Sequence, residues 1–257
     1  RGSRRYRAGR FVARHRLAMA LSSLLLASLC AGIGVAVWQA GEVARERDRA
    51  LIESQRAGAA LSFQREIFRR ARPAQHRGRE PTASGLLDIG EQLLAERSDL
   101  DSGVRATLIE ELSRSRASLG AFEAARRQAL EARALFESLG DRRAVLRVDI
   151  HLASLEERLD RVDEARARID RVLATAAEAG LAPADLYPAW YQHGILVGNA
   201  GDVDAADRAI SRAIELASLG AAPSTTAVGM EVVRAGFLSA AGRADEALAR
   251  LAAMRTR

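Results

Sequence analysis

Acidic side chains are the residues of this sequence whose type and spacing could support acid–base chemistry. Neighbouring acids occur as Glu110-Glu111 and as Glu156-Glu157. A pair of carboxylates can act as general acid and base when burial separates their pKa values. Arginines three or four residues away accompany these acids, which is typical of the solvated face of a helix. We therefore predict no catalytic residue and no enzyme activity for this chain.

Metal and cofactor motifs are also missing from the sequence. The single cysteine, Cys30, excludes an internal disulfide and a cysteine-based metal site, and the four histidines have no ligand spacing. No Gly-rich phosphate loop, His-Glu-x-x-His or Gly-x-Ser-x-Gly motif occurs. We predict no metal and no cofactor.

Aromatic side chains gather at one place, around Tyr187, Trp190, Tyr191 and His193. Core packing explains such a group, and the alternative is that Tyr191 lines a concave surface that binds an extended peptide. Helix phase and the repeat spacing place further candidates on that surface. The full set of candidates for this surface is Glu110, Arg114, Arg147, Ser154, Glu157, Tyr191 and Asn199.

A repeat of about 40 residues must position these side chains. The turn residues Gly120, Asp160, Gly201 and Gly242 follow one another at intervals of 40, 41 and 41 residues. Each is followed five residues later by an alanine, the small residue that lets two antiparallel helices cross closely; these are Ala125, Ala165, Ala206 and Ala247. The pattern predicts stacked helical hairpins, none of which can bury its apolar face alone.

The repeat resembles the tetratricopeptide repeat, with a longer period. Trp190, Gly194, Ala206 and Ala213 match the Trp, Gly, Ala and Ala positions of that family, whereas His193 and Val197 depart from its Leu and Tyr. The resemblance covers residues 103–257 and implies an all-α solenoid. It also implies that a protein or peptide ligand binds in the groove that the concave surface of the repeats forms.

Charge and hydropathy are distributed very unevenly at the start of the sequence. Residues 1–16 hold seven arginines and no acid, while the remaining residues balance 32 arginines against 33 acids. The basic character therefore belongs to one short arm, which argues against nucleic-acid binding by the repeats. Residues 17–38 carry no charge, which favours a transmembrane helix over the alternative of a cleaved signal peptide.

These patterns give an expected fold class and location. We predict an all-α chain with a single transmembrane helix and a stalk before the solenoid. The arm would lie in the cytoplasm, near anionic lipid headgroups, and the repeats across a bacterial inner membrane. The expected segments are a basic arm (1–16), a membrane helix (17–40), a stalk (41–72), a linker with a helix at about 83–96 capped by Thr82 (73–102) and about four repeats (103–257).

The arrangement as a whole is similar to the C-terminal half of bacterial membrane-anchored Ser/Thr protein kinases. The stretches that carry this resemblance are Arg5–Arg16, the uncharged span ending in Val37–Ala40, Ile67–Pro73 and Pro81–Gly90. It implies the sensor half of a receptor, with a possible homodimer and without the kinase motifs. The sequence leaves two alternatives open: the sensor half of a membrane-bound winged-helix transcription regulator, and an inner-membrane scaffold.

Overall fold

The computed structural model describes residues 61–71, 82–98, 100–220 and 222–254, together with eight isolated positions from 39 to 59. The chain divides into two units, residues 1–58 and 59–257. All the helices treated below belong to the second unit.

Every regular element among the described residues is helical, as the abundance of Ala, Leu, Arg and Glu predicts. The helices are α3 (Ala83–Glu96), α4 (Ser102–Ser118), α5 (Phe122–Ser138), α6 (Arg142–Arg158), α7 (Val162–Thr175), a 3-10 turn (Pro183–Leu186), α8 (Tyr187–Asn199), α9 (Val203–Ser218), α10 (Ser224–Ala240) and α11 (Ala244–Met254). A further helical segment spans 61–70. The predicted helix at 83–96 is confirmed as α3, in which the Thr82 hydroxyl accepts the backbone N–H of Gly85 at 3.1 Å.

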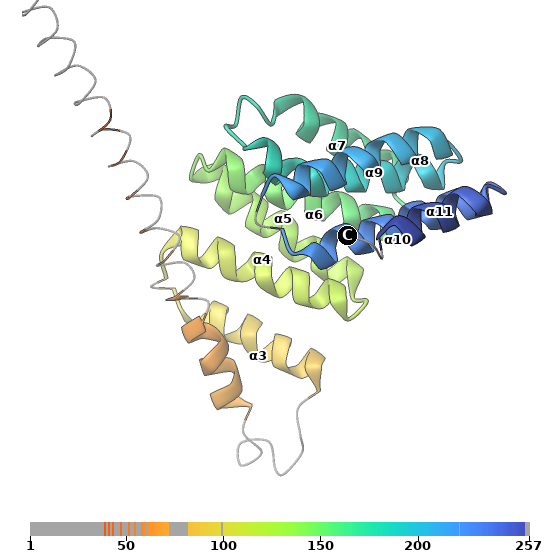
Figure 1. Cartoon of the computed structure of the whole chain (residues 1–257). Helices are drawn as coiled ribbons and strands as arrows, with labels where there is room; N and C mark the ends of the chain where they lie inside the picture. Colours follow the sequence, from red (N-terminus) through yellow and green to blue (C-terminus); the bar gives the residue numbers. More distant parts are fainter. Residues whose placement is uncertain are drawn as a thin grey trace, which may run out of the picture. The chain divides into compact units, whose positions relative to one another are not determined.

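Helices α4 to α11 form four hairpins in chain order, from yellow-green to blue in Figure 1: α4–α5, α6–α7, α8–α9 and α10–α11. The turn inside each hairpin contains a residue with positive φ, as the repeat predicts: Gly120 (79°), Asp160 (61°), Gly201 (94°) and Gly242 (78°). A left-handed residue there ends the first helix and reverses the chain. The alanines five residues further on are all buried, where the two helices of a hairpin cross. The all-α, tetratricopeptide-like part of the fold prediction is therefore confirmed.

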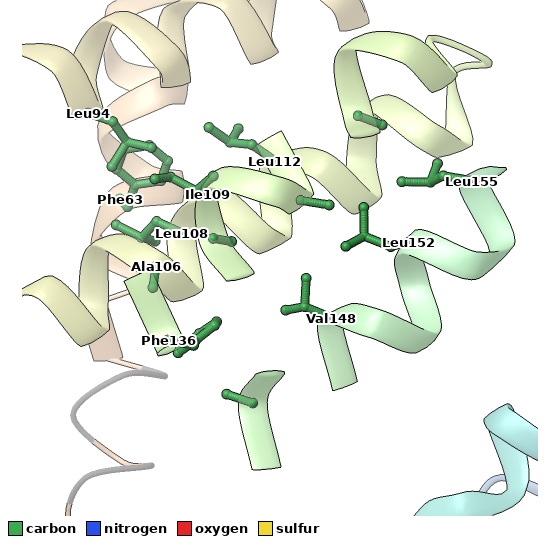
Figure 2. Close-up of a cluster of buried hydrophobic side chains, with 14 of the residues drawn as sticks. Phe63, Leu94, Ala106, Leu108, Ile109, Leu112, Phe136, Val148, Leu152 and Leu155 are labelled. Atoms are coloured by element: carbon green, nitrogen blue, oxygen red, sulfur yellow. The ribbon is translucent and has the colours of Figure 1, made fainter. Parts of the chain in front are cut away.

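The N-terminal end of the hairpin array is covered by helices that precede it. Phe63 of the 61–70 segment and Leu94 of α3 pack in one cluster with Leu108, Ile109 and Leu112 of α4 (Figure 2). The cluster continues through Phe136 of α5 to α6, so one apolar core joins these helices. Burial of these side chains supplies the main driving force for stacking the first hairpin on α3.

The fold class needs one correction, which concerns the membrane. Within the described part of the chain, no helix is both long and apolar enough to cross a bilayer. The physical reason is visible in helices such as α4 and α6, which carry charged residues along their exposed faces. The predictions of a single transmembrane helix and of an inner-membrane location are therefore wrong for the residues that the structure describes. The basic arm (1–16) and almost all of the predicted span (17–40) lie outside the described residues.

Candidate functional site

All seven predicted site residues lie on the first helices of the first three hairpins. Helix α4 holds Glu110 and Arg114, α6 holds Arg147, Ser154 and Glu157, and α8 holds Tyr191 and Asn199. Helix α4 contacts α6, and α6 contacts α8. The first helices therefore run beside one another, and we call the contact between consecutive hairpins a seam.

The structure brings three of the predicted residues together at the first seam. Glu110 is buried, at 2% exposure, and its carboxylate accepts hydrogen bonds from Arg114 Nη2 at 2.9 Å and from Arg147 Nε and Nη2 at 3.0 and 2.8 Å. Burial alone would raise the pKa of Glu110, but the hydrogen bonds and charges of Arg147 and Arg114 outweigh it and lower the pKa. Glu110 is therefore an ionised anchor that holds two partly exposed guanidinium groups.

Two more predicted residues meet at the second seam. The exposed Asn199 of α8 donates a hydrogen bond from Nδ2 to Glu157 Oε1 of α6 at 3.1 Å. Ser154, on the same face of α6, is partly buried. Both seams thus place polar groups of one hairpin against those of the next.

Tyr191 lies at the third seam, where α8 meets the last hairpin. Together with Tyr187 and Trp190 it packs against a buried cluster that includes Ile210 and Met230. Burial raises the pKa of the Tyr191 phenol, and the charge of Arg158 opposes this shift. The aromatic group thus packs against the core and leaves Tyr191 partly accessible.

A buried ionic network between α5, α6 and α7 was missed by the sequence analysis. Glu156 has no exposed surface, and it accepts two hydrogen bonds from the Arg168 guanidinium at 2.9 and 2.7 Å. Asp149 accepts from Arg168 Nη1 at 2.6 Å and from Arg133 Nε at 2.9 Å. The interpretation of Glu156 as a solvated residue was wrong, because its partner lies on the next helix rather than one turn away.

A buried serine–histidine contact joins α4 to α6. Ser113 Oγ donates to the Ala125 carbonyl at 2.8 Å and lies 3.0 Å from His151 Nε2. Because the hydroxyl proton is used on Ala125, the imidazole must donate from Nε2. Ser113 is fully buried, so its hydroxyl cannot meet a substrate, and the contact is a link between hairpins.

No group of metal-binding side chains occurs in the regions that the structure describes. The predictions that the chain has no metal, no cofactor and no enzyme activity remain predictions. The seven site residues likewise remain a proposal, since the structure shows their positions but no bound ligand.

Comparisons with known proteins support the fold. No family model matches the sequence, and no curated protein matches it. Among solved structures, the crystal structure of BtubC (BKLC) from P. vanneervenii is similar, with a TM-score of 0.53 and 19% identity over 80% of this chain and 92% of that chain. Two structures of a Podosopora anserina kinesin light chain protein with nearly identical TPR-like repeats give TM-scores of 0.55 and 0.53. Their identities are 18% and 17%, over 76% of this chain and 92% and 94% of theirs. At these identities the likeness concerns the fold alone, which is a tetratricopeptide-like helical repeat.

Proposed function

We propose that the repeats bind an extended segment of a protein partner along the exposed side of the first helices. The observation that carries this proposal is the alignment of α4, α6 and α8, which pairs Glu110 with Arg147 at the first seam and Glu157 with Asn199 at the second. An aligned row of helices offers side chains at a regular spacing, which suits a ligand without internal structure.

The chemistry of this surface changes from one hairpin to the next. Arg114 and Arg147 expose 41% and 49% of their side chains, and Asn199 is also exposed. The exposed face of α10, in contrast, carries no charge along Thr225–Ala240. A bound segment would therefore present oxygen acceptors, such as a carboxylate or backbone carbonyls, beside α4 and α6, and apolar side chains beside α10.

The proposal is tested by panning a random peptide display library against the purified 257-residue chain. We expect recovered peptides to bind in solution, with affinities measured by titration calorimetry. The variants Arg147→Ala and Tyr191→Ala should each weaken binding by roughly tenfold, or about 1.4 kcal/mol. Arg127→Ala, an exposed arginine on the second helix α5, is the matched control and should leave binding unchanged.

Two results would contradict this function. Peptides whose affinity falls in Arg127→Ala but not in Arg147→Ala bind the second helices of the hairpins rather than the first helices. A library that yields no specific binder, from chain whose helical circular dichroism is intact, argues against recognition of extended segments.

We further infer that this module could serve as the sensor half of a bacterial Ser/Thr kinase. That inference rests on the resemblance of Arg5–Arg16 and Pro81–Gly90 to the segments beside such kinases. The coding sequence upstream of Arg1 tests it. A frame with a Gly-rich loop, His-Arg-Asp and Asp-Phe-Gly supports the kinase, and a winged-helix frame or a nearby start codon contradicts it.

A further inference from the structure

The exposed side of the first helices changes its chemistry between the first seam and the third at equivalent positions of the repeat. Glu110 of α4 meets Arg147 of α6 at the first seam. Steps of 40 and 41 residues lead from Glu110 to Tyr191 of α8, and two steps of 41 lead from Arg147 to Gly229 of α10. The positions that hold an ion pair at the first seam therefore hold an aromatic ring and a glycine at the third.

The first seam sets two guanidinium groups against one carboxylate. Arg114 Nη2 and Arg147 Nε donate to the same oxygen, Oε1 of Glu110, at 2.9 and 3.0 Å, so the two groups lie side by side. The charges of Asp141 and Glu111 also act on Arg147, but less strongly than the charge of Glu110. A guanidinium carries five N–H groups, and the bonds to Glu110 use two of Arg147 and one of Arg114. Both arginines are partly exposed, so their other N–H groups favour a second carboxylate, which accepts stronger hydrogen bonds than a neutral carbonyl.

The third seam offers open space beside an aromatic ring. Tyr191 packs against the buried cluster that contains Met230, so this side chain lies against α10. Gly229 precedes Met230, and no atom of the described chain outside its own helix turn lies within 4 Å of the Cβ that a larger residue would add there. Tyr191 itself is only partly buried. A large apolar side chain of a bound segment would fill this space and remove the accessible part of the ring from water.

The distance between these two places sets how far apart the two side chains of a partner must lie. The first seam lies between α4 and α6, and the open space lies where α8 meets α10, so two helix spacings separate them. The axes of packed helices are about 8 to 10 Å apart, which gives roughly 16 to 20 Å. An extended chain covers about 3.3 Å per residue, so this distance corresponds to about five or six residues.

We propose that the partner segment is held at two points, by an acidic side chain at the first seam and by a large apolar side chain at the third. The acid binds Arg114 and Arg147, the apolar side chain fills the space at Gly229, and about five or six residues separate the two. This inference rests on the peptide-binding function proposed above, and it adds which side chains the segment must carry. The spacing is the same whichever end of the segment lies at the first seam.

The peptides recovered from the display library test the content and spacing of the segment. Their sequences should share an aspartate or glutamate and a large apolar residue about five or six positions apart. Synthetic copies with an acetylated N-terminus and an amidated C-terminus should still bind, because the acid is a side chain rather than a terminal carboxylate. Deleting three residues between the two anchors should weaken binding at least about tenfold, since the shorter segment cannot reach both places.

A double-mutant cycle locates the acidic side chain on the protein. Arg114→Gln in the full 257-residue chain, and replacement of the acid in the peptide by its amide, should each weaken binding about tenfold. The two changes together should cost no more than about tenfold, because both remove the same contact.

Gly229→Leu tests the apolar anchor from the side of the protein. The new side chain would occupy the open space itself, and leucine is a better helix former than glycine, so the fold should be retained. Peptide affinity should fall at least about tenfold. Ala134→Leu, which adds the same side chain at an exposed position of the second helix α5, is the matched control and should leave affinity unchanged. Helical circular dichroism of each variant shows that the fold is intact.

Three results would overturn this inference and leave the peptide-binding function in place. Peptides that depend on Arg147 and Tyr191 but share no acidic and apolar pair at this spacing are recognised in another way. Additive losses in the double-mutant cycle place the acid away from Arg114. An unchanged affinity in Gly229→Leu shows that the segment does not use the space at the third seam. A library without any specific binder contradicts the function itself, and this inference with it.

Discussion

At the scale of single residues, burial decides what a side chain of this protein can do. His151 lies beside Ser113 at the first seam, and burial lowers its pKa from 6.5 to about 4; the Arg114 charge acts in the same direction, and the Glu110 charge opposes both. The imidazole is therefore neutral in the folded chain at physiological pH. It holds two hairpins together as a hydrogen-bond donor rather than as a cation.

We expect His151 to make stability depend on pH in mild acid. Its folded pKa lies below the unfolded value, so as the pH falls the unfolded chain binds the proton first. The free energy of unfolding should therefore be unaffected above about pH 6.5 and fall between pH 6.5 and pH 4, with a contribution of about 2 kcal/mol at pH 4.5. Urea unfolding at pH 7 and pH 4.5 measures this loss. His151→Gln keeps a donor but cannot titrate, so the same loss in this variant would contradict the assignment.

The buried network around Arg168 predicts a large cost for removing one charge. Arg168→Ala leaves Glu156 fully buried, with the Arg126 guanidinium 3.5 Å from its carboxylate, and it leaves Asp149 paired with Arg133 alone among the described residues. Breaking such a pair should lower the free energy of unfolding by about 3 to 5 kcal/mol. Arg161→Ala removes an arginine from a pair with Glu123, in which both partners are solvent-exposed, and should cost less than about 1 kcal/mol. If denaturant titrations gave equal losses of unfolding free energy for the two variants, the buried pairs of Arg168 would stabilise the fold no more than an exposed pair.

At the scale of helices, the repeat period was predictable from the sequence because turn chemistry is local. Gly120, Gly201 and Gly242 could be recognised as left-handed residues, and the alignment placed Asp160 with them although aspartate rarely adopts positive φ. The burial of Glu110 could not be predicted, since Arg114 one turn away is the usual partner on a solvated helix. The deciding partner, Arg147, lies 37 residues further along the chain and meets Glu110 only after the hairpins stack. Most of the fold and the helix of each site residue could thus be predicted, but not which candidates would be buried.

Helix-interior glycines distinguish close packing from open surface. In Gly194→Ala the new Cβ would lie 2.6 Å from Ile210 Cγ1, so α8 and α9 must separate, and we expect a loss of about 1 to 3 kcal/mol in the free energy of unfolding. In Gly236→Ala, on α10, nothing lies within 4 Å of the new atom. This variant should gain up to about 1 kcal/mol, because alanine favours the helix. Thermal and urea unfolding measure both changes, and a stabilising Gly194→Ala would contradict the close approach.

At the scale of the whole repeat unit, each hairpin is stabilised by its neighbours, so stability should vary along the array. Helices α6 and α7 have hairpins on both sides, whereas α11, among the described helices, packs mainly on α10 and touches α9 through the Arg250–Asp207 pair. We expect amide hydrogen exchange, followed by mass spectrometry, to be slowest in α6 and fastest in α11. Equal protection of α6 and α11 would contradict this gradient.

Among the described residues, helices cover the N-terminal side of the array, and the α10–α11 hairpin exposes apolar side chains, which gives growth by gene duplication a preferred side. A hairpin copied after α11 would find Val228, Val232 and Leu248 ready to receive it. A hairpin copied before α4 would first have to displace α3 and the 61–70 segment from their shared core. We therefore expect descendants of this gene to differ in length by whole hairpins at the C-terminal side, and to keep the N-terminal helices constant.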